Sequence, residues 1–229
     1  MLNILKTAFC VCAFSALCQT ASGDMIYNVT LDTAPLVGHP AGPFYVEATF
    51  TDGSGVGDAN NTVTMSNFTF GGGSALGGPL VFGGASGSLA TGVTITDSSI
   101  NSLFSEQFAP GLLLSFSLGL TSNDDAGGTP DGFTFFILDS SGVALPTLAP
   151  FGDYFLGAAL GSTGPVFDAW GSDPSRAPSV GNPVSIPAPT VTSVSSVPEP
   201  STIYLLGGCL AMMVVLRHRL PRLGHKGEG

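Results

Sequence analysis

The sequence predicts an all-β fold, an antiparallel β-sandwich, with a jelly roll as one form of it. Apolar and polar residues alternate with a period of two over much of residues 24–172, as they do on strands with one buried and one wet face. Glycine-rich turn segments separate the alternating runs. Short antiparallel strands joined by such turns are typical of sandwiches.

The expected strands follow from this alternation in chain order. In residues 25–31 the odd positions are apolar, whereas in residues 44–50 and 114–120 the even positions are apolar. Glycine, serine and aspartate clusters between the runs favour turns. We expect strands over residues 25–31, 44–51, 62–70, 93–96, 114–121, 133–138 and 155–160, with turns at 52–55, 71–73, 83–87 and 122–132.

Two further elements are expected within this domain. One is a hairpin turn at residues 139–142, where an Asp-Ser-Ser-Gly segment separates two apolar runs. The other is a helix over residues 99–108, because apolar residues recur there at three- and four-residue spacing. These residues are Ile100, Leu103, Phe104 and Phe108.

Residues 1–23 are predicted to be a secretory signal peptide. Lys6 supplies a positive start, an apolar run of about 12 residues follows at 7–18, and small residues at 21–23 suit cleavage. A membrane anchor is the alternative, but a spanning helix needs about 20 apolar residues. Lipoprotein processing at Cys18 is disfavoured, because Leu17 stands where a small residue is required.

The sandwich is expected to end at residue 172, with a stalk over residues 173–196. Five prolines in this segment favour extended, polyproline-like backbone that stands away from a core. A final edge strand around residues 184–194 is the alternative. The Ser and Thr residues at 190–196 suit O-glycosylation or a plain linker equally.

The C-terminal segment, residues 197–229, has three parts in order. A Pro-Glu-Pro-Ser motif comes first and an apolar run follows at about 202–216. About 14 apolar residues form a helix of about 21 Å, which flanking residues and arginine stems bring close to the bilayer core of about 30 Å. The arginines are expected to form a basic cytoplasmic tail, with everything N-terminal outside. The motif is Pro198, Glu199, Pro200 and Ser201, and the basic stop is Arg217, Arg219 and Arg222.

This tripartite tail resembles the PEP-CTERM sorting signal of bacterial surface proteins, a Pro-Glu-Pro motif followed by a short transmembrane helix and an arginine-rich end. The resemblance covers residues 197–222. It implies that an exosortase, a transpeptidase-like membrane enzyme, recognises Pro198, Glu199 and Pro200 and processes the chain near them. The middle of the chain is similar, more loosely, to the Gly- and Phe-rich β ectodomains that precede this signal.

The same resemblance implies a location. Family members are exported by Gram-negative bacteria that make exopolysaccharide. The chain is thus expected to be anchored in the inner membrane before processing and then to reach the cell surface or the extracellular matrix. An ordinary single-pass membrane anchor is the alternative reading of the tail.

Charge and cysteine placement exclude several function classes. Between the two terminal segments, 14 acidic residues accompany a single basic one, Arg176. Such a surface repels phosphate backbones, so no nucleic-acid binding is expected. All four cysteines lie in the terminal apolar runs, which leaves residues 24–196 without a disulfide, a thiolate metal site or a cysteine nucleophile.

An oxygen-rich loop at residues 123–131 is the candidate metal site. Asp124, Asp125 and Asp131 supply carboxylates on a glycine-containing loop, the ligand type that calcium prefers. A second loop at residues 52–60 imitates part of an EF-hand loop but lacks two of its oxygen ligands. Asx-rich loops also cap hairpins without metal. No cofactor is therefore expected other than calcium at the first loop.

Catalytic chemistry is poorly supplied, and no enzyme activity is expected. His39 is the only histidine between the terminal segments and lies in a turn-like Gly-His-Pro segment, which disfavours Ser-His-Asp chemistry. Glu47 and Glu106, the only glutamates there, are the basis of a weak glycosidase alternative. Sugar binding would need exposed aromatic rings on a sandwich face. The candidates are Tyr45, Phe136, Tyr154 and Trp170.

The leading hypothesis from the sequence is an exported, non-enzymatic protein of the cell surface or exopolysaccharide matrix. Its expected partners are an exosortase-like membrane enzyme, the membrane itself through the C-terminal helix, and exopolysaccharide. The runner-up is a calcium-assisted carbohydrate-binding module, and a glycosidase is third.

Overall fold

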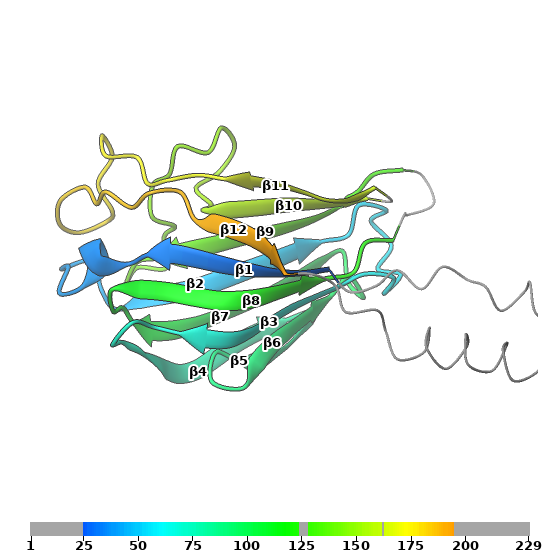
Figure 1. Ribbon diagram of the computed structural model, residues 1–229, viewed down its shortest axis with the longest axis horizontal. Coiled ribbons are helices and arrows are strands. Elements are labelled where there is room, and N and C mark those ends of the chain that lie inside the picture. The colour runs from blue at the N-terminus through cyan, green and yellow to red at the C-terminus, as the bar shows by residue number, and fades with distance from the viewer. Residues whose placement is uncertain (1–24, 124–127, 162, 195–229) are drawn as a thin grey trace, which may run out of the picture. The chain divides into compact units, whose positions relative to one another are not determined.

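The computed structural model describes residues 25–123, 128–161 and 163–194. These residues form two six-stranded antiparallel sheets packed as a sandwich (Figure 1), so the predicted all-β sandwich is confirmed. The predicted signal peptide at 1–23 and the sorting segment at 197–229, with its helix at about 202–216, lie outside the described residues. No helix within the described ranges is long and apolar enough to cross a membrane.

The chain passes several times between the two sheets. Its strands are β1 (Met25–Asp32), β2 (Phe44–Thr51), β3 (Thr62–Thr69), β4 (Ser74–Phe82), β5 (Gly84–Ser88), β6 (Gly92–Thr96), β7 (Asn101–Ala109), β8 (Leu113–Leu120), β9 (Asp131–Leu138), β10 (Leu156–Gly161), β11 (Gly164–Ala169) and β12 (Thr190–Val194). A short 3-10 turn, η1 (Ala34–Leu36), follows β1. Sheet A has the strand order β12-β1-β8-β3-β6-β5, and sheet B has the order β11-β10-β9-β2-β7-β4.

The predicted alternation sets which side chains enter the core. Along β2, Val46, Ala48 and Phe50 are buried while Glu47 and Thr49 between them are only partly covered. Burial of one phenylalanine side chain contributes about 1.5–3 kcal/mol, so the aromatic layer between the sheets dominates the core. Its fully buried members are Phe44, Phe50, Phe104, Phe108, Phe133, Phe135 and Phe155.

The helix predicted over residues 99–108 is wrong, because this segment forms strand β7. Phe104 and Phe108 are four residues apart, a spacing that places two side chains on one face of a strand as well as of a helix. Ile100, the first member of the supposed helical stripe, is 55% exposed. β7 pairs with β2 on one side and with β4 on the other. This pairing on both edges decides the conformation, and the spacing of apolar residues along the segment does not reveal it.

The structure also differs from the predicted turns and hairpin in detail. Residues 84–88, expected to be part of a glycine-rich turn, form β5 and pair with β6. The turn at residues 139–142 does close: the Asp139 amide donates to the Val143 carbonyl oxygen at 2.8 Å. It is followed by a single bridge between Leu138 and Ala144 instead of a full return strand.

Residues 173–189 are not a free stalk, and the domain does not end at residue 172. This segment, here named the strap, crosses from the end of sheet B to sheet A and leads into β12 (Figure 1, yellow to orange). Val184 and Ile186 are 5% and 2% exposed and belong to the core. β12 then pairs with β1, with Thr190 opposite Thr30. The edge strand kept as the alternative therefore exists at residues 190–194.

Polar contacts hold the strap in place. The Ser172 hydroxyl donates to the Val184 carbonyl oxygen and accepts from the Ile186 amide, both at 2.7 Å. The Ser179 amide donates to the Asp139 carboxylate at 2.9 Å. Prolines keep the strap extended, but its two apolar side chains still reach the core. The prediction of a stalk, which rested on the proline content, was therefore wrong about the packing of this segment.

The chain enters and leaves the sandwich at the same end. Ile26, at the start of β1, lies opposite Val194, at the end of β12. The strap closes the other end, where η1 and the following loop also lie (Figure 1).

Replacing one buried strap residue tests this arrangement. Ile186→Ala should lower the free energy of unfolding by about 2–5 kcal/mol, because it removes packed core volume. Val180→Ala, at a strap position that is 49% exposed, is the matched control and should change it by less than about 0.5 kcal/mol. Urea denaturation followed by circular dichroism measures both. If both substitutions left the free energy of unfolding unchanged, the segment would be a stalk that does not pack against the core.

Candidate functional site

Loops from three parts of the chain meet at the end where the chain enters the sandwich. They bring together five polar residues, here named the Asx cluster: Asp52, Asn61, Asp97, Asn123 and Asp131. Four of them, all but Asn123, are at most 3% exposed. The two oxygen-rich loops that the sequence singled out separately, 52–60 and 123–131, are therefore neighbours in space.

Asn61 and Asp131 connect the cluster. The Asn61 side-chain amide donates to Asp131 Oδ2 at 2.8 Å, and the Gly53 backbone amide donates to Asp131 Oδ1 at 2.7 Å. Oδ1 of the Asn61 side chain accepts from the Asn123 backbone amide at 2.7 Å. Asp52 is held by donors of its own loop, including the Ser54 hydroxyl at 2.7 Å. Neutral donors thus supply the hydrogen bonds that these carboxylates need.

Asp97 and Asp131 form a carboxyl pair. The pKa of Asp97 is raised to about 7, mainly by burial, while the Asn61 backbone amide that donates to Asp97 acts against this. A hydrogen bond from Asp97 to Asp131 and the charges of Asp131 and Asp58 contribute to the same raised value. Two carboxyl groups in hydrogen-bond contact share a proton, because two buried like charges are costly.

Of the three predicted calcium ligands, Asp124, Asp125 and Asp131, the structure describes Asp131. Asp131 is buried, and both of its oxygens accept protein hydrogen bonds. Asp124 and Asp125 lie outside the described residues. Within the ranges that the structure covers, no group of three His, Cys, Asp or Glu side chains is placed to hold a metal ion. The calcium site therefore stays a prediction.

A second group of residues, four aromatic and two acidic, lies on the outer face of sheet B across β2, β9, β10 and β11. We name it the aromatic face. Strand register places its members side by side, since Glu47 of β2 lies opposite Phe136 of β9 and Thr49 opposite Thr134. The Thr49 and Thr134 hydroxyls are 2.5 Å apart, so both side chains lie on the same face, and their partial burial between buried neighbours makes it the outer one. The aromatic face consists of Tyr45, Glu47, Phe136, Tyr154, Asp168 and Trp170.

Asp168 of β11 organises one half of the aromatic face. The Tyr154 hydroxyl donates to Asp168 Oδ2 at 2.5 Å, and the Trp170 indole N–H donates to the same oxygen at 3.0 Å. Phe136 contacts the Tyr154 ring edge-on, with centroids 6.3 Å apart. A Cβ at Gly157 would lie 2.2 Å from Asp168 Oδ1. Glycine at this position leaves the space that the carboxylate occupies.

The aromatic face carries negative charge in a partly dry setting. Burial among its neighbours raises the pKa of Glu47. The pKa of Tyr154 is raised mainly by burial and further by its hydrogen bond to, and the charge of, Asp168. The four aromatic residues that the sequence proposed for sugar binding all contribute to this face.

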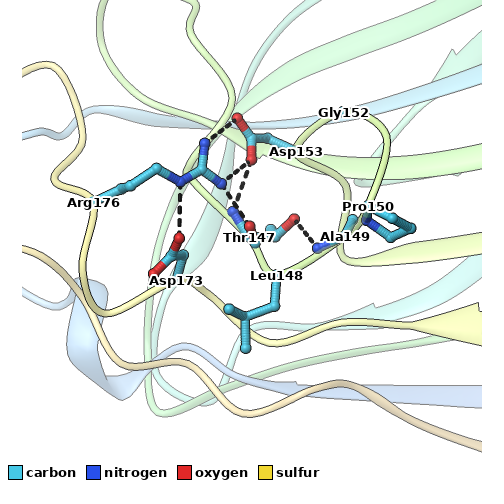
Figure 2. Close-up of a pocket in the computed structure, with 8 residues that line it drawn as sticks. All are labelled: Thr147, Leu148, Ala149, Pro150, Gly152, Asp153, Asp173 and Arg176. Carbon is cyan, nitrogen blue, oxygen red and sulfur yellow. Dashed lines mark hydrogen bonds and ion pairs between the residues drawn. The ribbon is translucent and has the colours of Figure 1, made fainter.

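A pocket of about 390 Å³ lies beside the strap, between residues 147–153 and 173–176. Arg176 reaches across it (Figure 2): its guanidinium donates to the Asp153 carboxylate and to the Thr147 carbonyl oxygen, both at 2.5 Å, and to Asp173 at 3.0 Å. Four of the five N–H donors of Arg176 bind protein oxygens, and two carboxylates neutralise its charge, so Arg176 joins the strap to the preceding loop.

The residues weighed for catalysis are not brought together. Glu106 lies opposite Val46 with its side chain in the core and 1% exposed, while Glu47 is on the outer face. Two carboxyls on opposite faces of a sheet cannot flank one glycosidic bond. His39 Nδ1 accepts from the Ala41 amide, so Nε2 carries the proton and donates to the strap at the Asn182 carbonyl oxygen. His39 therefore anchors the strap.

The residues predicted for sorting, Pro198, Glu199, Pro200 and Ser201, and the basic stop of Arg217, Arg219 and Arg222 lie outside the described residues. Sequence reasoning also missed Asn61 and Asp97. Asp97 directly follows the alternating strand 93–96. An acidic residue at a strand end, in a chain with other loops rich in Asp and Asn, was the signal that could have identified it. No protein family, curated protein or solved structure matches the chain.

The carboxyl pair predicts an unusual pH dependence of stability. An unfolded aspartate titrates near pH 3.9, whereas Asp97 in the folded chain has a pKa of about 7. Between these values the folded chain holds a proton that the unfolded chain has released. This pair's contribution is therefore fully present at low pH and is lost as pH rises to about 7. The expected slope is up to about 1.4 kcal/mol per pH unit.

Asp97→Asn should remove this slope and make the domain more stable than the parent at about pH 8, since the amide is neutral and donates to Asp131. Urea unfolding at a series of pH values measures it. Asp32→Asn, at the opposite end of β1, is the control and should retain the slope. A parent whose stability does not fall with pH would show that Asp97 is ionised.

Proposed function

We propose that the chain is an exported, non-enzymatic protein of the cell surface or exopolysaccharide matrix, processed by an exosortase-like membrane enzyme. The observation that carries the proposal is the order of segments in one sequence: an apolar leader, an acidic sandwich, and a tail of Pro198-Glu199-Pro200, an apolar run and arginines. A sandwich whose ends emerge together suits this plan, because leader removal and tail anchoring both act at one end.

We further propose that the sandwich is jelly-roll-like. β1 pairs with β8, β8 with β3, and β3 with β6, while β2 pairs with β7 and β7 with β4. These nested pairings, which alternate between the two sheets, are those of two interleaved Greek keys. β5 departs from this plan, since it extends sheet A beside β6 instead of extending sheet B. The later strands widen both sheets: β9, β10 and β11 extend sheet B beside β2, and β12 extends sheet A beside β1.

Mass spectrometry of the mature protein tests the exported, sorted state. The expected product begins near Asp24 and ends near Pro198, because both terminal segments are removed. Deletion of residues 198–200 is the matched variant and should leave the C-terminal segment attached. A wild-type product that reaches Gly229 in cells with an active sorting enzyme would favour a simple membrane anchor. A product that keeps Met1 and stays in the cytosol would overturn the proposal.

The second candidate is a calcium-assisted carbohydrate-binding module. The observation that favours it is the meeting of loops 52–60 and 123–131 in the Asx cluster, since calcium sites are built from oxygen ligands on adjacent loops. Asp124, Asp125 and Asp131 are its predicted ligands, and Asp131 also accepts a hydrogen bond from Gly53 of the neighbouring loop.

A glycan array with and without a chelator tests this candidate. The module predicts binding that the chelator abolishes and a melting temperature that calcium raises. The double variant Asp124→Asn with Asp125→Asn should lose both responses and keep the fold. An unchanged melting temperature in calcium and in chelator would eliminate calcium from the function.

A further inference from the structure

We propose that the aromatic face of sheet B is the surface that binds a neutral polysaccharide chain, without calcium. This inference rests on the proposed function as a surface or matrix protein, for which it names the contact site and the chemical class of the partner. The face runs across four neighbouring strands, from β2 through β9 and β10 to β11.

The first argument is the composition of the face. Three aromatic side chains lie close together: Phe136 packs edge-on against Tyr154, and Tyr154 shares Asp168 with Trp170. Tyr45 lies on the same face one strand away, opposite Leu138. These rings are partly exposed, unlike the core phenylalanines. Aromatic rings in this setting offer apolar faces to the C–H surface of a sugar ring while their polar tips remain hydrogen-bonded.

The second argument is that polar groups flank the rings. Glu47 lies between Phe136 on β9 and Ser105 on β7, and the hydroxyls of Thr49 and Thr134 follow along the strands. Carboxylate oxygens accept hydrogen bonds from sugar hydroxyls, and protein hydroxyls both donate to them and accept from them. A ring platform with a few placed polar groups is the usual composition of a small-molecule site.

The third argument is charge, which selects the class of polysaccharide. Glu47 and Asp168 make the face anionic, and the one basic residue in the described part of the chain, Arg176, is engaged by Asp153 and Asp173. An acidic polymer such as alginate would be repelled. A neutral hexose polymer meets no such penalty.

The fourth argument is position. Tyr45 and Phe136 lie toward the strap end of their strands, whereas Asp131, at the start of β9, belongs to the Asx cluster at the other end. The aromatic face therefore does not include the predicted calcium ligands. Chelation should leave glycan binding unchanged, which separates this inference from the calcium-assisted module.

Trp170 provides a direct test, because it is the only tryptophan in the full chain. Its fluorescence would be titrated with three neutral polymers, namely dextran, mixed-linkage β-glucan and galactomannan, and with alginate. We expect at least one neutral polymer to shift the emission to shorter wavelength, equally with and without chelator, and alginate to have no effect. Native electrophoresis in gels containing the same polymers gives an independent measure of binding.

Variants locate the contact. Tyr45→Ala and Phe136→Ala should each weaken binding about tenfold, the loss expected from removing one stacking ring. Phe151→Ala is the matched control, since Phe151 is 86% exposed on a loop outside the aromatic face, and it should bind like the parent. Unchanged circular dichroism spectra and melting temperatures identify the variants that retain the fold.

The inference is overturned if none of the three neutral polymers binds, if alginate binds as well as they do, or if folded Tyr45→Ala and Phe136→Ala bind like the parent. Loss of binding on chelation would overturn it in favour of the calcium-assisted module. None of these outcomes alters the proposed export and processing, which the mass of the mature protein reports separately.

Discussion

The shortage of basic residues constrains how this structure stabilises its buried carboxylates. Fourteen acidic residues share the region between the terminal segments with one arginine, so buried carboxylates cannot be neutralised by ion pairs. They are stabilised by neutral donors instead: backbone amides hold Asp139, a backbone amide and the Asn61 side-chain amide hold Asp131, and backbone amides with a hydroxyl hold Asp52. Where two carboxyls meet, at Asp97 and Asp131, the pKa of Asp97 is raised to about 7, so below that pH a bound proton removes one of the two negative charges.

This way of stabilising acids also orders the loops. A carboxylate that accepts several backbone amides fixes the path of the chain that supplies them. Asp139 holds its own turn through the Ser141 and Val143 amides and binds the strap through Ser179. Asp52 does the same for the loop that follows β2. Buried acids therefore shape both ends of the sandwich.

The sequence was sufficient for the fold class and for the strands with clean alternation, because period-two patterning follows directly from one-sided burial. It failed where pairing or tertiary contact decides the conformation. Phe104 and Phe108 fit both a helix and a strand, and only pairing with β2 and β4 separates the two. In the strap, proline spacing suggested a stalk, although Val184 and Ile186 already offered two apolar side chains for the core.

The candidate sites show the same division. Residue types identified the oxygen-rich loops and the four aromatic rings, but not their neighbours. Asn61 and Asp97 become part of a cluster only because strands β3 and β6 are paired, and such pairing has no local signature. The aromatic face likewise depends on the register that places Glu47 beside Phe136 and on Gly157 leaving room for Asp168. A one-residue slip of β2 would turn Glu47 into the core and Phe50 outward. The same phenylalanine layer that stabilises the sandwich therefore fixes which side chains lie on the outer face of sheet B.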